Sequence, residues 1–226
     1  MFTFTTLELA QAVIFVLMFL LISGPVHECA HAFVAWKLGD GTAKLFGRIS
    51  LDPVRHFDPV GGTLLAASVF LSLIATHSTF GFGWAKPTPV NPYNLRGRHA
   101  DSMVAAAGPL SNLVLAALFA VGFRIMFSNG IYPGNTSVPT MVALVFEMGI
   151  VLNVVLMVFN LIPIPPLDGS HVLFDFLDPR TAHELRNTLN QYGMMILFLF
   201  IFLGGQVIFA VVAPIVNFLA GVQLYQ

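Results

Sequence analysis

The chain of 226 residues is 57% hydrophobic and only 9% charged, and its mean hydropathy is +0.83. Soluble domains carry about 25% charged residues, so this composition excludes an ordinary soluble protein and indicates a chain that lies largely in a membrane. The net charge of −1 gives no reason to expect nucleic acid as a partner. A single cysteine, Cys29, excludes an internal disulfide and a metal site made of thiolates alone.

Apolar segments follow one another along the chain, at residues 7–37, 61–77, 101–128, 140–162 and 190–222. A helix needs about 20 residues to cross the hydrocarbon core. The first, third and fourth segments are long enough, and the second is marginal. The last can bend at Gly204-Gly205 and again at Pro214, into one broken helix or two. We expect an all-α polytopic membrane protein with about four to six membrane segments, in which residues 1–226 form a single integral-membrane domain.

Two connecting segments have patterns of their own. Residues 42–53, TAKLFGRISLDP, alternate between apolar and polar side chains. The expected fold therefore includes a small membrane-associated β hairpin or sheet. Residues 80–94, FGFGWAKPTPVNPYN, contain too much proline and glycine for a helix and indicate an ordered loop.

Basic residues distinguish two topologies for the marginal segment 61–77. If this segment crosses the membrane, basic residues fall about equally on both sides. If it enters and returns, the loops 38–60, 80–100 and 163–189 share one face with nine of the ten lysines and arginines. Because basic loops face the cytoplasm, we favour a re-entrant segment with this face on the cytoplasmic side. Re-entrant backbone must be buried in protein or line a wet cavity, so this topology also predicts a cavity.

The residues HECAH at 27–31 end the first apolar segment. On a helix, His27 and His31 share a face and can both reach one ion. Glu28 lies between them, close enough to hold a water at that ion without being a ligand. This is the arrangement of zinc hydrolases. The alternative is a chance spacing of two histidines, but ionisable side chains in apolar helices are costly and usually functional. Cys29 points away from the histidines and is expected to be a small buried hydrophobe.

A catalytic zinc site needs a third protein ligand and one open position. Asp168 is favoured because the proline-rich segment LIPIPPL holds it at the start of a new helix, where free backbone N–H groups can steady its carboxylate. Its alternative role is to cap the helix 169–178. Glu147 remains a competitor, and His171 can instead orient a ligand. The other candidates for this ligand are Asp175, His56, His77 and His99.

Together these residues resemble the site-2 protease family of intramembrane zinc metalloproteases, over nearly the whole chain. HECAH at 27–31 is similar to the family's HExxH, and NLIPIPPLDG at 160–169 resembles its Asn…Pro…Leu-Asp-Gly motif. GFGWAKPTPVNP at 81–92 and AAGPLSN at 106–112 resemble stretches of the compact prokaryotic branch. Larger members carry a PDZ or CBS domain, for which we expect no room here.

The resemblance implies roles for individual residues. One Zn²⁺ per chain would be bound by His27, His31 and Asp168. Glu28 would be the general base, and Asn160 would hold the substrate peptide or its oxyanion. The reaction would be hydrolysis of a peptide bond in or near a transmembrane segment of a membrane protein, in regulated intramembrane proteolysis.

The same resemblance implies a location and partners. We expect an integral protein of the prokaryotic cell (inner) membrane, with its active site toward the cytoplasmic side. Its partners would be the lipid bilayer and a protein substrate with a transmembrane helix, and the oligomeric state is left open. Such a substrate must unwind before attack, and an exposed strand edge can accept an extended peptide. Residues 42–51 are the candidate edge, with a simple packed hairpin as the alternative.

Two asparagines in the apolar segments have weaker assignments. Asn112 is expected to satisfy the backbone freed by Pro109. Asn153 is expected either to join two helices by a hydrogen bond or to belong to the site.

Two other functions stay open on the sequence. A membrane zinc endopeptidase of the prenyl-protein type also uses HExxH, but it takes a glutamate from a later helix as third ligand, for which Glu147 is the candidate. The second is a non-hydrolytic zinc-binding membrane protein, either a transporter or an inactive scaffold. The chain lacks the paired repeats of broken helices typical of transporters, and Glu28 argues against an inactive scaffold.

Overall fold

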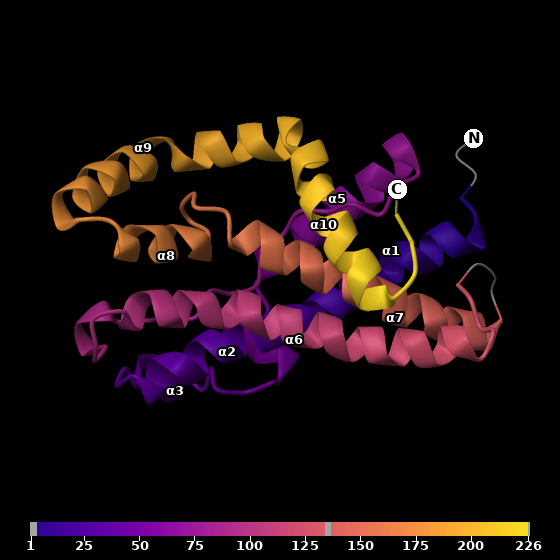
Figure 1. The fold of residues 1–226 in the computed structure, drawn as a ribbon, viewed down its shortest axis with the longest axis horizontal. Coiled ribbons are helices and arrows are strands. Elements are labelled where there is room, and N and C mark those ends of the chain that lie inside the picture. Colours follow the sequence, from indigo (N-terminus) through magenta and orange to yellow (C-terminus); the bar gives the residue numbers. More distant parts are fainter. Residues whose placement is uncertain (1–3, 134–136, 226) are drawn as a thin grey trace.

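The structure, a computed structural model, describes residues 4–133 and 137–225, and its regular elements in these ranges are all helical (Figure 1). The long helices are α1 (Thr6–Met18), α2 (Gly24–Lys37), α5 (Pro59–Thr76), α6 (Ala100–Ser128), α7 (Val138–Asn160), α9 (Pro179–Leu203) and α10 (Gly205–Ala220). A π-helical turn, Phe19–Ser23, joins α1 to α2. The short helices are α3 (Thr42–Leu45), α4 (Pro53–His56), a 3₁₀ turn at Pro92–Asn94, and α8 (Asp168–Phe176).

Within the described residues, 4 helical segments are long and apolar enough to cross a membrane: Thr6–Lys37, α5, α6 and α7. Helices α9 and α10 together form a further candidate, bent by 70°. The bend lies at Gly204, as the sequence predicts, whereas Pro214 lies inside α10 and does not interrupt it. The predicted range of four to six membrane segments is therefore confirmed.

Helix α6 is the centre of the molecule and packs on α2, α7, α8 and α10 (Figure 1). Its contact with α7 is close because glycines on each helix receive phenylalanines of the other. A Cβ atom on Gly122 would lie 2.2 Å from the ring of Phe146, and one on Gly149 would lie 2.4 Å from the ring of Phe119. Small residues allow helices in lipid to approach closely, so this packing fixes the end of α7 relative to α6.

The first membrane segment contains a register change just before its histidines. The N–H of Gly24 donates to the carbonyl of Phe19, five residues back, and closes the π-helical turn. Pro25 follows and has no N–H to donate, so the ordinary helical ladder is interrupted there in any case. Single π turns of this kind occur often at functional sites, and this one leads directly into the helix that carries His27 and His31.

The β hairpin expected over 42–53 is wrong. Residues 42–45 form α3, Gly47 has a φ of 67°, and α4 follows. Side-chain hydrogen bonds favour these short helices. Asp52 is the N-cap of α4 and accepts from the N–H of Val54 at 3.1 Å, and Asp40, just before the N-cap Gly41 of α3, accepts from the N–H of Thr42 at 3.0 Å. The strand edge expected at 42–51 is therefore absent.

The chain after α5 returns alongside that helix. The N–H of Phe82 donates to Ser68 Oγ at 2.9 Å, near the middle of α5. Farther along, the N–H of Lys86 donates to the carbonyl of His56 at 2.8 Å, just before α5 begins. The helix and the returning segment thus form a hairpin whose two ends lie side by side. This geometry agrees with the re-entrant topology favoured by the basic residues.

Candidate metal centre

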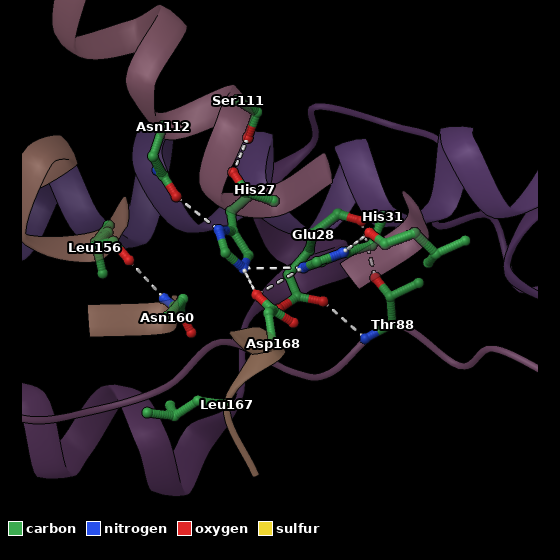
Figure 2. A network of polar contacts seen from close by, with 12 residues as sticks. His27, Glu28, His31, Thr88, Ser111, Asn112, Leu156, Asn160, Leu167 and Asp168 are labelled. Atoms are coloured by element: carbon green, nitrogen blue, oxygen red, sulfur yellow. Dashed lines mark hydrogen bonds and ion pairs between the residues drawn. The ribbon is translucent and has the colours of Figure 1, made fainter. Parts of the chain in front are cut away.

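Helix α2 brings the two imidazoles of the HECAH segment together (Figure 2). His27 and His31 are both buried, and their Nε2 atoms lie 3.0 Å apart. The spacing of four residues stacks them on one face of the helix, as the sequence predicts.

Asp168 reaches the same point from the first residue of α8. Its Oδ2 lies 3.3 Å from His27 Nε2 and 3.4 Å from His31 Nε2. Helix α8 can begin here because Gly169 has no side chain: a Cβ atom would lie 2.2 Å from the carbonyl oxygen of Leu161 at the end of α7. The alternative role of Asp168 as a helix cap is wrong, since Leu167 occupies the cap position.

Hydrogen bonds on the far side of each ring orient the imidazoles. His27 Nδ1 lies 2.6 Å from Asn112 Oδ1, and His31 Nδ1 lies 2.7 Å from the carbonyl oxygen of Val104. Both oxygens can only accept, so each Nδ1 carries a proton, and in the neutral ring each Nε2 has its lone pair free to bind a metal at the centre. Asn112 in turn donates to Asn153 Oδ1 at 2.9 Å.

These contacts decide the roles of the two asparagines. Asn112 orients His27, so the prediction that it satisfies the backbone near Pro109 is wrong. Asn153 joins α7 to α6 through Asn112, which confirms the helix-joining alternative.

The converging atoms fit a zinc ion. Two nitrogen lone pairs and a carboxylate oxygen meet with no donor between them, and Asp168 Oδ2 is buried without any hydrogen bond of ordinary geometry to the described residues. A tetrahedral zinc with bonds of about 2.0–2.1 Å separates its ligand atoms by roughly 3.3 Å, close to the distances observed here. His27, His31 and Asp168 are the one such group of histidine, cysteine and acidic residues in the described ranges.

Helix α6 closes one side of the group through Gly108. A Cβ atom on this residue would lie 2.3 Å from His31 Nε2 and 2.6 Å from His27 Nε2. Only glycine lets α6 approach the imidazoles this closely, which gives a physical reason for the glycine in the AAGPLSN segment.

Glu28 lies beside the converging atoms, held by a residue of the loop that follows α5 (Figure 2). Its Oε2 accepts from the backbone N–H of Thr88 at 2.7 Å. The sequence does not single out Thr88, although its position between Pro87 and Pro89 is a visible signal. Asn160 is the last residue of α7 and is half-buried, and its Nδ2 donates to the carbonyl of Leu156 at 2.9 Å.

The other candidate ligands have partners elsewhere. His171 pairs with Asp101 at 2.9 Å rather than with a ligand, and Asp175 with His99 at 2.7 Å. The remaining pairs are His77 with Glu8, His56 with the carbonyl of Ser50, and Glu147 with Tyr225.

Comparison with known proteins agrees with this geometry. Residues 126–204 match the model of peptidase family M50. A Bacillus subtilis protein named as zinc metalloprotease YwhC is 38% identical over 180 residues, which cover 78% of this chain and 75% of that protein. No solved structure matches the chain.

Two mycobacterial relatives carry a similar name. A protein of Mycolicibacterium smegmatis named as zinc metalloprotease Rip2 is 32% identical over 180 residues, 78% of this chain and 62% of that protein. Its namesake in Mycobacterium tuberculosis is 31% identical over 187 residues, 80% of this chain and 65% of that protein. With 38% identity to YwhC over most of both chains, this chain belongs to peptidase family M50, the site-2 protease family of zinc metalloproteases.

Proposed function

We propose that this zinc metalloprotease hydrolyses a peptide bond in or near a transmembrane segment of a membrane-protein substrate, in regulated intramembrane proteolysis. One observation carries the proposal: two imidazole nitrogens and a carboxylate oxygen converge within 3.0–3.4 Å of one another, and two of them belong to the apolar segment Thr6–Lys37. A protease whose metal ligands lie in a membrane-spanning helix is suited to substrates in the same membrane.

We assign the metal to His27, His31 and Asp168. Zinc bound there would polarise the carbonyl of the substrate's peptide bond and lower the pKa of a bound water to near neutral. Asn112 and the carbonyl of Val104 keep both ligand nitrogens deprotonated and aimed at the centre.

Two further residues of the chain carry the proton and the developing charge. Glu28 takes a proton from the attacking water and returns it to the leaving amine. Asn160, at the end of the helix that leads to Asp168, holds the substrate peptide and stabilises the oxyanion with its amide.

The proposal includes the prokaryotic cell membrane and a site toward its cytoplasmic side. Helix α2 ends at Lys37, shortly after the histidines, and the basic loops gather beyond that end. Water can enter among these polar loops. The partner is a protein with a transmembrane helix that must unwind locally, because the backbone hydrogen bonds of a helix protect its peptide bonds.

The alternative of a prenyl-protein type endopeptidase is disfavoured. It needs a glutamate as third ligand, but the carboxylate that converges with His27 and His31 is that of Asp168, and Glu147 interacts with Tyr225 instead. Replacement of each acid in turn tests this point: Asp168→Asn should lose bound zinc, and Glu147→Gln should retain it.

The central test uses purified protein in lipid vesicles with a model transmembrane substrate. Glu28→Gln should lower the cleavage rate at least about 100-fold, the scale of general acid–base catalysis, with zinc content unchanged by atomic emission. Glu184→Gln, an exposed change on α9, is the matched control and should cleave normally. Wild-type cleavage by the Glu28→Gln protein would refute the proposed function.

A further inference from the structure

Glu28, the general base of the proposed reaction, is hydrogen-bonded by a residue outside its own helix. Thr88 donates its backbone N–H to Glu28 Oε2 at 2.7 Å and its hydroxyl to the backbone carbonyl of Glu28 at 2.9 Å. The first bond fixes the carboxylate, and the second fixes the backbone that bears it. Because the two residues are far apart in the sequence, both hydrogen bonds depend on the position of the loop after α5.

The sequence around Thr88 suits this task. Pro87 and Pro89 have no backbone N–H, so the segment presents a single amide donor at this point of the loop. Pro89 also restricts the residue before it to extended conformations. The N–H of Thr88 therefore points toward Glu28 with little further loss of conformational entropy on folding.

A buried arginine ties the same loop to the chain before α5. Arg48 is 3% exposed, and its guanidinium donates to the carbonyl oxygens of Arg55 and Lys86 and, at 2.7 Å, to that of Pro87. Burying a guanidinium is costly unless hydrogen bonds compensate it. These bonds join the two ends of the α5 hairpin immediately next to Thr88.

We propose that Thr88 is a positioning residue for Glu28 and that Arg48 keeps the loop carrying Thr88 in place. This inference rests on the proposed function, since it matters for catalysis only if Glu28 is the base. The new element is that the orientation of Glu28 depends on the loop after α5, in another part of the chain.

The first experiment compares conservative changes at Thr88 in the vesicle assay. Thr88→Val removes the hydroxyl but keeps the shape, and should lower kcat about tenfold, the worth of one hydrogen bond in a catalytic arrangement, with KM and zinc content unchanged. Thr88→Ser restores the hydroxyl and should recover kcat to within about twofold. Thr76→Val, the same change at an exposed site at the other end of α5, should leave kcat unchanged.

The second experiment measures the contact without any activity. In protein labelled with ¹⁵N-threonine, NMR should show slow hydrogen exchange of the Thr88 amide in wild type and fast exchange in Glu28→Ala, which removes the acceptor. Arg48→Lys keeps the positive charge but loses the planar fork, and should speed this exchange while zinc content is unchanged. Arg48→Gln is the second variant if the lysine protein does not fold, with the same expectation.

The outcomes separate this inference from the proposed function. If Glu28→Gln abolishes cleavage but Thr88→Val keeps the wild-type kcat, the function stands and the role of Thr88 is refuted. Loss of zinc in parallel with activity, or no rescue by serine, would also overturn the positioning role. Exchange of the Thr88 amide that is equally slow in Arg48→Lys and wild type would overturn the part assigned to Arg48.

Discussion

Gly108 leaves the space that the imidazoles of His27 and His31 occupy, so the metal centre depends on this glycine as well as on its ligands. A Cβ atom at this residue would lie 2.3 Å from His31 Nε2, far inside any real contact, so either α6 must move away or the imidazoles must turn. We predict that Gly108→Ala lowers zinc affinity on the order of 10- to 100-fold, the usual cost of disturbing the groups that orient metal ligands. Competition with a fluorescent chelator measures this affinity.

The matched control for this substitution is Gly41→Ala, because a Cβ atom on Gly41 meets nothing within 4 Å. It should bind zinc as wild type does. Normal affinity in the Gly108→Ala protein would show that α6 yields easily and does not constrain the imidazoles.

At this scale, the sequence is most informative where residues of one short segment act together. His27 and His31 share a helix, so their convergence follows from spacing alone. Asp168 comes from far along the chain. Its proline-rich surroundings make it a candidate, and the resemblance to a family motif raises it over Glu147. Thr88 and Gly108 act through contacts between distant segments, so the prolines beside Thr88 mark it as unusual but do not predict its partner Glu28.

At the scale of elements, the error over residues 42–53 has a clear cause. Alternation predicts a strand when one face of it is buried, but here the pattern does not follow burial. Leu45 and Phe46 are 89% and 70% exposed, whereas the polar Arg48 is buried. The hydrogen bonds that Asp40 and Asp52 accept from the first residues of α3 and α4 favour short helices instead. By contrast, the long apolar helices follow from length and composition, because lipid requires helical backbone.

Helix α8 carries Asp168 and is joined to the start of α6 by two histidine–carboxylate pairs. His171 lies 2.9 Å from Asp101, and His99 lies 2.7 Å from Asp175. The hydrogen bond to Asp101 raises the pKa of His171 against the opposing effect of burial. This pair therefore makes the docking of α8 sensitive to pH.

The direction of that sensitivity follows from linkage. Because the pKa of His171 is higher in the folded protein than its unfolded value of about 6.5, the stabilisation is complete below about pH 6.5 and is lost as the pH rises through the folded-state pKa. We predict that metal-depleted wild type melts about 1–3 °C above Asp101→Asn at low pH, the scale of a half-exposed ion pair. This difference should shrink toward zero at alkaline pH.

Melting curves followed by intrinsic fluorescence measure this difference. They should cover about pH 5.5 to pH 9, the range in which histidine side chains titrate. His183→Gln is the control, because His183 is exposed on α9 and its partner is the uncharged Asn187. A difference that is constant over this range, or that grows at high pH, would contradict the assignment to His171.

At the scale of the whole molecule, the α5 hairpin and the distribution of basic residues favour the same topology, in which this hairpin enters the membrane and returns. Both ends of the α5 hairpin lie together, at His56 and Lys86, so the loops before and after it belong to one face. Arg124, the one basic residue outside the predicted basic face, donates to the carbonyls of Leu219 and Phe218 in α10 and thereby satisfies its guanidinium within the helices. Both features favour a topology in which the metal centre lies beside the same basic face.

Labelling of single cysteines tests this topology. In a Cys29→Ser background, Lys44→Cys, before the hairpin, and Tyr93→Cys, after it and 97% exposed, should react with a membrane-impermeant maleimide from one side of sealed vesicles. Ser128→Cys, at the far end of the 29-residue α6, should react only from the other side, because a helix of that length spans about 43 Å. If α5 crossed the membrane, the cysteines at positions 44 and 93 would react from opposite sides, and the re-entrant hairpin would be refuted.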